Sequence, residues 1–185
     1  MSMPLYMKNS VGDGIDIESN DNTIINNFIT VRFGDGVFIL GKDRNIIKGN
    51  KIVNGRIRLD TSVNGTADDN QVLDNTIISS GLEGIFVGGK RVVIQGNTID
   101  QSGGNGIEVA SFQSGGTPFI SEDVIIKKNS ITNSNGDGGI KIRSLNGAVT
   151  LNTVIIDNTF AGNGNDNLVD GGDGTTKAGN TPSLM

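Results

Sequence analysis

A short motif recurs along the chain: an apolar residue, two variable residues, Asn, one variable residue and a second apolar residue. Its six copies are Ile24-Asn27-Ile29, Ile47-Asn50-Ile52, Val72-Asn75-Ile77, Ile94-Asn97-Ile99, Ile126-Asn129-Ile131 and Ile155-Asn158-Phe160. Successive asparagines are 23, 25, 22, 32 and 29 residues apart. A repeat with a period of roughly 20–50 residues indicates a solenoid, in which each small unit of structure stacks on the next.

A second motif, two apolar residues separated by one, precedes each copy of the first. Its copies are Ile15/Ile17, Val37/Ile39, Ile57/Leu59, Ile85/Val87, Ile107/Val109 and Ile140/Ile142. This alternation is the period of a β-strand. Because one unit cannot bury its apolar side alone, stacking pairs each strand in parallel with its copy roughly 4.8 Å along the axis. We therefore predict about six coils over residues 12–163, with a ladder of asparagines that hydrogen-bond amide to amide.

The composition agrees with an all-β fold and excludes several functions. The 28 glycines and many asparagines favour tight turns, and Ile and Val favour strands. The chain has no Cys and no His, which excludes disulfides, Cys nucleophiles, His-containing triads and His-based zinc sites. A net charge of -5 makes nucleic acid a poor partner, and no apolar run is long enough to span a membrane.

The coils differ in length at one corner. Between the second apolar residue of the strand motif and the first of the Asn motif, the step is 7 or 8 residues in three coils. It is 13, 17 and 13 residues in the other three, with insertions containing TSVNGTADDN, ASFQSGGTPFISED and RSLNGAVTLNT. Loops stacked at one corner predict a wall beside the face of the first strand, and such irregular parts commonly carry function.

Alternation also identifies the residues that point outward from these strands. The central outward row is Asp16, Phe38, Arg58, Phe86, Glu108 and Lys141, and the next row is Glu18, Leu40, Asp60, Gly88, Ala110 and Arg143. Aromatic faces suit sugar rings, and Arg and Lys suit carboxylates. We predict an acidic polysaccharide as the partner, bound by Phe38, Arg58, Asp60, Phe86, Glu108, Lys141 and Arg143. The alternative is a solvated strand face with salt bridges between coils.

The whole pattern, from Gly12 to Phe160, resembles the right-handed parallel β-helix of the pectate-lyase-like superfamily. The resemblance implies the handedness of the coil. It implies little about function, because this fold hosts many activities.

Polygalacturonases of this fold carry Asn-Thr-Asp-Gly-Ile-Asp, followed one coil later by Gly-Asp-Asp and then by Gly-His-Gly and Arg-Ile-Lys. The segment from Gly12 to Asp16 matches the second half of the first motif, and Gly34-Asp35-Gly36 matches the second except for Gly36. The third motif falls near residues 55–57, without His, and Ile140 to Arg143 is similar to the last. This resemblance implies a carboxylate pair, Asp13 and Asp35, one coil apart.

Alginate C5-epimerases carry Tyr-Gly-Phe-Asp-Pro-His-Glu, which matches residues 13–19 here. The key Asp is kept as Asp16, whereas Asp13 replaces Tyr, Glu18 replaces His, and Leu40 replaces an Asp of the next coil. Proton abstraction from a uronate needs a base, an acid and a group that neutralises the carboxylate. The two resemblances together give the candidate catalytic residues as Asp13, Asp16, Glu18 and Asp35.

The two ends of the chain carry weaker patterns. Residues 1–11 are predicted to form an N-terminal cap, and residues 164–185 a Gly/Asn/Asp-rich tail. The segment Gly162 to Leu168 resembles one calcium-binding nonapeptide, which implies calcium as a possible cofactor at Asp166; a tail without metal is the alternative. Thinly capped ends leave strand edges open, which favours self-association through the helix ends.

Two classes of function are open at this stage. The first is a divergent uronate-polymer lyase, epimerase or hydrolase that uses the acidic face near Asp13. The second is a non-catalytic β-helix that binds glycans or serves as a structural or appendage module. The missing family residues favour the second, and the aromatic and charged face favours the first. We expect a location outside the cell or on the surface of a cell or virion.

Overall fold

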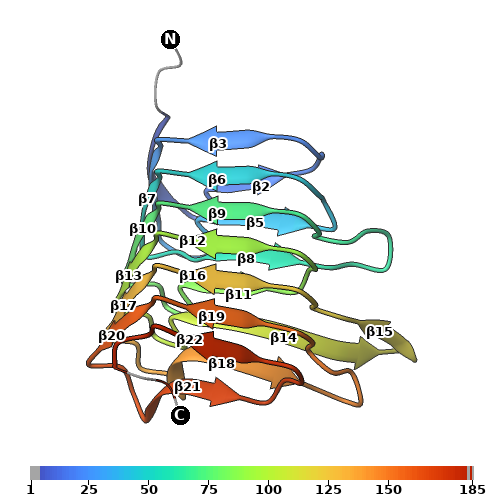
Figure 1. Cartoon of the computed structure of the whole chain (residues 1–185). Coiled ribbons are helices and arrows are strands. Elements are labelled where there is room, and N and C mark those ends of the chain that lie inside the picture. The colour runs from blue at the N-terminus through green and yellow to red at the C-terminus, as the bar shows by residue number, and fades with distance from the viewer. Residues whose placement is uncertain (1–4, 183, 185) are drawn as a thin grey trace.

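The computed structural model describes residues 5–182 and 184, which form a parallel β-helix of about seven coils with no helix in this part of the chain. Figure 1 shows the strands stacked along one axis, each coil contributing one strand to each of three sheets. The all-β parallel β-helix predicted from the repeat is confirmed. No helix in the described residues is long and apolar enough to cross a membrane.

Apart from the antiparallel pairing of β14 with β15, the strands of every sheet are parallel and follow the order of the coils. The first sheet contains β1 (Tyr6–Ser10), β4 (Phe28–Val31), β7 (Lys51–Val53), β10 (Thr76–Ile78), β13 (Thr98–Asp100), β17 (Ser130–Thr132) and β20 (Thr159–Ala161). The second contains β2 (Ile15–Ile17), β5 (Val37–Leu40), β8 (Ile57–Asp60), β11 (Ile85–Val87), β14 (Ile107–Ser114), β18 (Gly138–Ser144) and β21 (Asp166–Asp170). The third contains β3 (Thr23–Ile25), β6 (Ile46–Lys48), β9 (Gln71–Leu73), β12 (Val93–Gln95), β16 (Ile125–Lys127), β19 (Val154–Ile156) and β22 (Thr176–Ala178).

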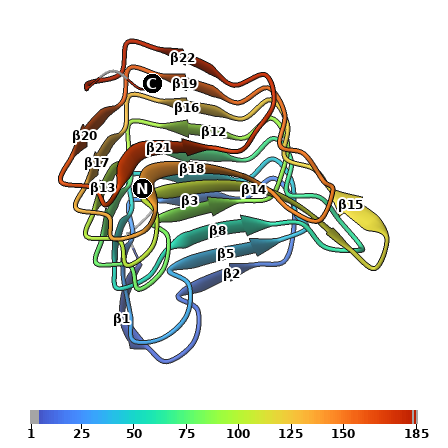
Figure 2. The same ribbon diagram turned by 90° about the horizontal axis from the view of Figure 1, so that it is seen from below.

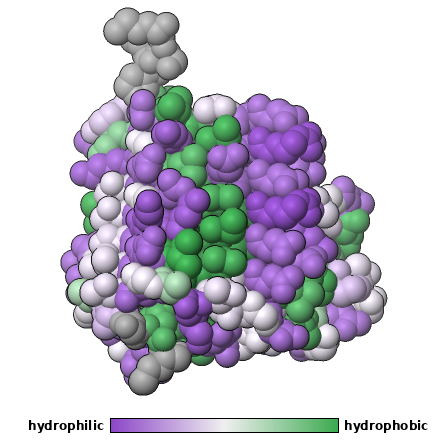
Figure 3. Space-filling view, viewed as in Figure 1, coloured by the Kyte–Doolittle hydropathy of each residue, from purple (hydrophilic) through white to green (hydrophobic). Residues whose placement is uncertain are grey.

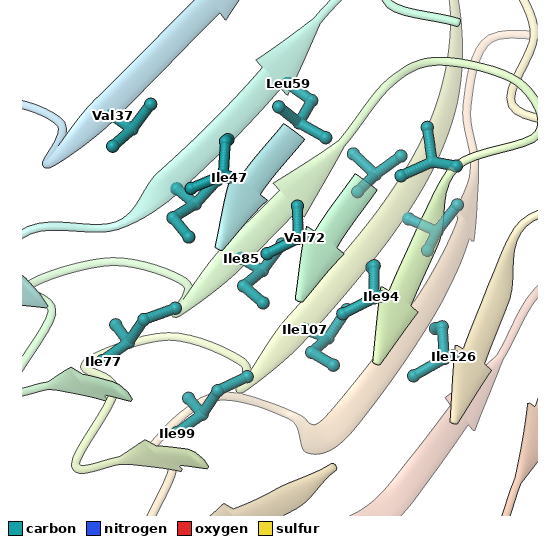
Figure 4. Close-up of a cluster of buried hydrophobic side chains, with 14 of the residues drawn as sticks. Val37, Ile47, Leu59, Val72, Ile77, Ile85, Ile94, Ile99, Ile107 and Ile126 are labelled. Carbon is teal, nitrogen blue, oxygen red and sulfur yellow. The ribbon is translucent and has the colours of Figure 1, made fainter. Parts of the chain in front are cut away.

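The core is a continuous column of Ile and Val side chains that project inward from all three sheets (Figure 4). In β5, β8, β11 and β14 the first and third residues face this core, as the alternation predicts, and Val37, Ile57, Leu59 and Ile85 are fully buried. Figure 3 shows the outer face of the third sheet, which carries a central apolar band between polar margins. Outward positions of that sheet include Ile46, Val93, Ile125 and Val154, all partly exposed.

The predicted asparagine ladder is confirmed. In each step, Nδ2 of one ladder asparagine donates to Oδ1 of the next at 2.9–3.0 Å, through Asn27, Asn50, Asn75, Asn97, Asn129, Asn158 and Asn180. The residue before the ladder asparagine adopts the left-handed conformation that bends the chain, as at Asn26 and Asp74, whose φ angles are 57° and 54°.

The coils extend beyond both predicted boundaries. Strand β1 pairs in parallel with β4, so residues 6–10 belong to the solenoid, and Tyr6 stacks on Phe28 at 4.9 Å. Met3 and Pro4, also assigned to the cap, lie outside the described residues. At the other end, β21 and β22 form a further coil within the segment predicted to be a tail. The ladder continues to Asn180, which lies 22 residues after Asn158.

The long insertions lie at the C-terminal ends of the strands in the second sheet. The first forms a turn in which Ser62 and Gly65 pair, and the second forms an antiparallel hairpin between β14 and β15 (Thr117–Phe119). Figure 2 shows the hairpin and neighbouring loops projecting from one edge of the coils. The expected wall beside the outer face of the second sheet is therefore present at that edge.

Candidate ligand-binding groove

A groove of about 470 Å³ opens where the first sheet turns into the second. We call it the corner groove. Three arginines, two phenylalanines, two carboxylates and one leucine dominate its lining: Arg32, Arg56, Arg58, Phe33, Phe38, Asp13, Asp35 and Leu82. These residues come from four successive coils, so only stacking brings them together.

The second sheet positions two of these side chains through strict register. Phe38 of β5, Arg58 of β8 and Phe86 of β11 are paired neighbours, and each lies between two inward-facing apolar residues of its own strand. The guanidinium of Arg58 lies 5.0 Å from the centre of the Phe38 ring. That of Arg56 lies 5.9 Å from the ring of Phe86. The face therefore alternates aromatic rings with stacked cations.

A buried network of ions forms the floor of the corner groove. Arg56 Nε donates to Asp35 Oδ1 at 2.6 Å, and its Nη1 contacts Glu83. These three side chains are only 10–18% exposed. Burial would lower the pKa of Arg56, but hydrogen bonds and charges from Asp35 and Glu83 outweigh it and raise that pKa. Because buried charges need partners, Asp35 and Glu83 use the charge of Arg56 to stabilise the fold.

Two other arginines leave charge accessible to a ligand. Arg58 donates to Asp60 at 2.6 Å and lies 3.8 Å from Asp35, yet its side chain is 34% exposed. Arg32 is exposed at the rim, forms no ion pair within residues 5–182, and lies over Phe33 at 5.6 Å. Phe33 is itself 65% exposed. The rim thus offers one aromatic face and one uncompensated cation side by side.

The structure brings Asp13 and Asp35 into the same groove, as the polygalacturonase resemblance implied, but both contact protein groups. Asp13 Oδ1 accepts a hydrogen bond from the backbone N–H of Asp35 at 2.6 Å. The same bond recurs in a later coil, where Gly138 donates to Asn105 Oδ1 at 3.0 Å. Asp13 therefore braces the corner between two coils, in the role that an asparagine has elsewhere.

Gly36 stands where the polygalacturonase motif has its second Asp. A Cβ atom at Gly36 would lie 2.3 Å from Cγ2 of Ile52, and the corresponding glycines Gly14 and Gly106 are pressed against isoleucines in the same way. The close approach of the corner to the first sheet excludes any side chain there. The repeated glycine is therefore a requirement of the scaffold.

Asp16 and Glu18 lie in the first coil, outside the lining of the corner groove. Asp16 is the central residue of β2, paired with Phe38 in the next coil, and both carboxylates are exposed. Partial burial, followed by the charges of Glu18 and Asp13, raises the pKa of Asp16. This raises the basicity of Asp16 at the edge of the aromatic and cationic face.

The seven residues predicted to bind substrate do not line one groove. Phe38 and Arg58 do, whereas Asp60 is 8% exposed beneath Arg58, and Phe86 lies against Arg56. Glu108, Lys141 and Arg143 form a separate cluster further along the sheet. Alternation correctly placed these residues outward, but it could not indicate that arginine side chains fold over Asp60 and Glu108.

Within that cluster, Glu108 is 3% exposed. It accepts a hydrogen bond from Asn105 Nδ2 at 2.9 Å, and its other oxygen lies 2.9 Å from Arg143 Nη2. Burial raises the pKa of Glu108, while the charge of Arg143 opposes that shift. Lys141 contacts Asp137. These charges largely satisfy one another.

The predicted calcium ligand, Asp166, opens β21 and pairs with Gly138. Among residues 5–182 and 184, no group of three or more acidic or other ligating side chains gathers around a metal position. The segment from Gly162 to Leu168 thus turns into a strand of the next coil. A hollow of about 330 Å³ lies beside it, lined mainly by Gly and Asn.

Sequence reasoning missed the corner residues of the groove: Arg32, Phe33, Arg56, Leu82 and Glu83. They lie outside the alternating strands, so a period of two does not define their direction. A signal was present at Arg56, which occupies the position of the third polygalacturonase motif. Its pairing with Asp35 and Glu83 joins three adjacent coils.

The chain matches the family model for a right handed beta helix region over residues 6–181 and belongs to that family. No curated protein matches it. The periplasmic alginate epimerase AlgG has a similar structure, with a TM-score of 0.74 and 16% identity over 95% of this chain and 44% of that one.

Two further solved structures share the fold. The A-module of the mannuronan C-5 epimerase AlgE6 from Azotobacter vinelandii aligns with a TM-score of 0.65 and 17% identity, covering 95% of this chain and 55% of that one. A mannuronic acid specific family 6 polysaccharide lyase from human gut microbiota aligns with a TM-score of 0.62 and 16% identity, covering 89% and 49%. At such identities the likeness shows the fold alone, and this chain spans about half the length of these structures.

Proposed function

We propose that the corner groove binds a segment of an acidic polysaccharide, and that a uronate polymer is its ligand. The observation that carries this proposal is the side-by-side placement of arginine and phenylalanine side chains, exposed at Arg32-Phe33 and half-buried at Arg58-Phe38. A uronate presents a flat sugar face and a carboxylate on one ring. Aromatic rings contact the former, and guanidinium groups hydrogen-bond the latter.

The charge distribution supports a local site for an anion. The chain as a whole carries a net charge of -5, so attraction of a polyanion depends on the rim of the corner groove. Interactions of exposed charges are screened by salt over about 8–10 Å. Binding by this groove should therefore weaken as ionic strength rises. The similar structures include two alginate epimerases and a lyase, which is consistent with a ligand of this class.

Affinity electrophoresis in gels containing alginate or polygalacturonate tests the proposal. The parent chain should be retarded by either acidic polymer and not by a neutral polymer such as dextran. Arg32→Gln and Phe33→Ala should reduce retardation severalfold, because each removes a side chain that lines the corner groove. Both side chains are exposed, so the fold should tolerate either change. Arg44→Gln is the matched control, since Arg44 is an exposed arginine paired with Asp21 at another corner. Equal retardation of the parent and both rim variants would count against the corner groove.

Processing of the same polymer is a second candidate, favoured by the raised pKa of Asp16 beside Phe38. A lyase would generate unsaturated uronates, which absorb ultraviolet light, and an epimerase would change the NMR spectrum of the polymer. Either activity should be lost in Asp16→Asn while retardation persists. Retardation without turnover would favour the non-catalytic alternative, a glycan-binding or appendage module. Because such polymers lie outside cells, we place the protein there or on a cell or virion surface.

A further inference from the structure

A second hollow lies at the opposite end of the strands that form the corner groove. It has a volume of about 300 Å³ and lies between the turn after β8 and the β14–β15 hairpin. We call it the loop groove. Its lining includes Val63 and Thr61 from the turn, Pro118 and Phe119 from the hairpin, and Lys90. Phe119 is held in place by stacking on Phe112 at 4.8 Å.

Strand β8 connects the two grooves. Arg56, directly before the strand, and Arg58, its second residue, line the corner groove, and Thr61, directly after its end, lines the loop groove. Five residue steps of an extended strand span roughly 17 Å. A ligand that reached both grooves would therefore cover several sugar rings and would run across the coils, along the strand direction.

Between the grooves the Arg58 side chain lies over Asp60. The neighbour of Asp60 in the next coil is Gly88, where a Cβ would lie 3.1 Å from Asp60 Oδ1, so this residue adds no side chain to the surface. Leu40, on the other side of Asp60, is 42% exposed and offers apolar contact. Beneath this floor, Asp60 Oδ1 and Thr61 Oγ1 make no hydrogen bond within residues 5–182 and 184. Buried polar atoms without partners are uncommon, and these two lie at the end of β8, between the corner groove and the loop groove.

The chemistry of the two grooves is also related. Each combines a phenylalanine with a partly exposed cation that is also paired with a carboxylate. The corner groove has Phe38 with Arg58, which contacts Asp60, and the loop groove has Phe119 with Lys90, which contacts Glu122. The loop groove adds hydroxyl groups from Ser62 and Thr66. Aromatic faces, hydroxyls and separated cations suit a chain of several acidic sugars better than a compact anion.

We propose that the corner groove and the loop groove are two halves of one site, and that an extended acidic oligosaccharide crosses the second sheet along β8 to fill both. This inference rests on the proposed function of the corner groove. It adds the direction of the bound chain, its minimum length and the role of the first two insertions.

Isothermal titration with a disaccharide and an octasaccharide of the same uronate tests the inference. The octasaccharide should bind the parent chain at least tenfold more tightly than the disaccharide. Val63→Asp places a negative charge in the loop groove at a residue that is 81% exposed, so the fold should tolerate it. Val63→Asp and Phe119→Ala should each remove most of the octasaccharide's advantage and leave disaccharide affinity unchanged. Val149→Asp, on another loop and 41% exposed, should change neither affinity.

The outcomes separate the two proposals. If the octasaccharide binds Val63→Asp and Phe119→Ala as tightly as the parent, the loop groove is not part of the site, while the corner groove still binds sugar. If neither oligosaccharide binds the parent, the proposed function fails, and this inference fails with it. Circular dichroism of each variant establishes that the fold is intact.

Discussion

Replacement of Asn97 by alanine tests whether the asparagine ladder holds the coils together. Asn97 lies in the middle of the ladder and is 1% exposed. Its Oδ1 accepts hydrogen bonds from the backbone N and Nδ2 of Asn75 at 2.9 and 3.0 Å. Its Nδ2 donates to the carbonyls of Val72 and Gln95 at 2.9 and 3.2 Å and to Asn129 Oδ1 at 3.0 Å. Alanine removes all five bonds without changing the backbone.

The size of the effect follows from which partners are left unsatisfied. In the variant, Asn75 Nδ2 still donates a hydrogen bond to the carbonyl of Ile47. Asn129 Oδ1 still accepts one from the backbone N–H of residue 97. The buried N–H of Asn75 loses its acceptor, at a cost of about 1–3 kcal/mol, and each other lost bond has a net worth of about 0.5–1.5 kcal/mol. We therefore expect Asn97→Ala to lower the free energy of unfolding by roughly 4 kcal/mol.

Urea unfolding followed by far-ultraviolet circular dichroism measures this change. An unchanged m value indicates that the variant and the parent expose the same amount of surface in a single unfolding transition. The central position matters because terminal coils of a solenoid can unfold separately. Asn64→Ala is the matched control: Asn64 is exposed in the turn after β8 and should change stability by less than about 0.5 kcal/mol. A loss below about 1 kcal/mol for Asn97→Ala, at an unchanged m value, would refute the ladder argument.

Two further predictions concern the corner glycine and the buried glutamate. Gly36→Ala should destabilise the fold by about 1–3 kcal/mol in the same unfolding assay, because the added Cβ would clash with Ile52. Gly81→Ala is the control and should have little effect, because no atom lies within 4 Å of its added Cβ. Glu108 has a raised pKa in the fold, so it binds protons more tightly there than in the unfolded chain. Its contribution to stability is therefore present at low pH and is lost as pH rises through that raised pKa. Urea midpoints measured from about pH 4 to pH 7 should fall less for Glu108→Gln than for the parent; equal pH dependence would contradict this explanation.

Much of the scaffold could be predicted from the sequence, because it follows from repetition. The ladder asparagines, the buried alternating residues and the corner insertions recur in a fixed order, and stacking in register is the arrangement that buries them all. The final coil was missed because Lys177 occupies the apolar position before Asn180, which disguises the last copy of the motif. A second ladder, from Asn22 through Asn45 to Asn70, was missed because valine replaces asparagine at residues 92 and 124.

The site was less predictable than the scaffold. The outward direction of Phe38 and Arg58 followed from alternation, so half of the aromatic and cationic pairing could be anticipated. Arg32, Phe33 and Arg56 lie in corners, where no period defines the direction of a side chain. The contact of Arg56 with both Asp35 and Glu83 depends on how far a long side chain reaches across neighbouring coils. Such contacts follow from three-dimensional packing and leave no local pattern.

The parallel register gives the molecule a modular character. Each coil pairs only with the coil before and the coil after it, and the ladder asparagines at each step form the same bonds. Removal of residues 51–75 as one complete coil would let Asn50 meet Asn97 and would preserve the column of buried residues. It would also remove β8, with Arg56 and Arg58, and bring β5 against β11. Gain or loss of a single coil can thus change which side chains lie next to one another on the outer surface, while the buried core and the asparagine ladder stay the same.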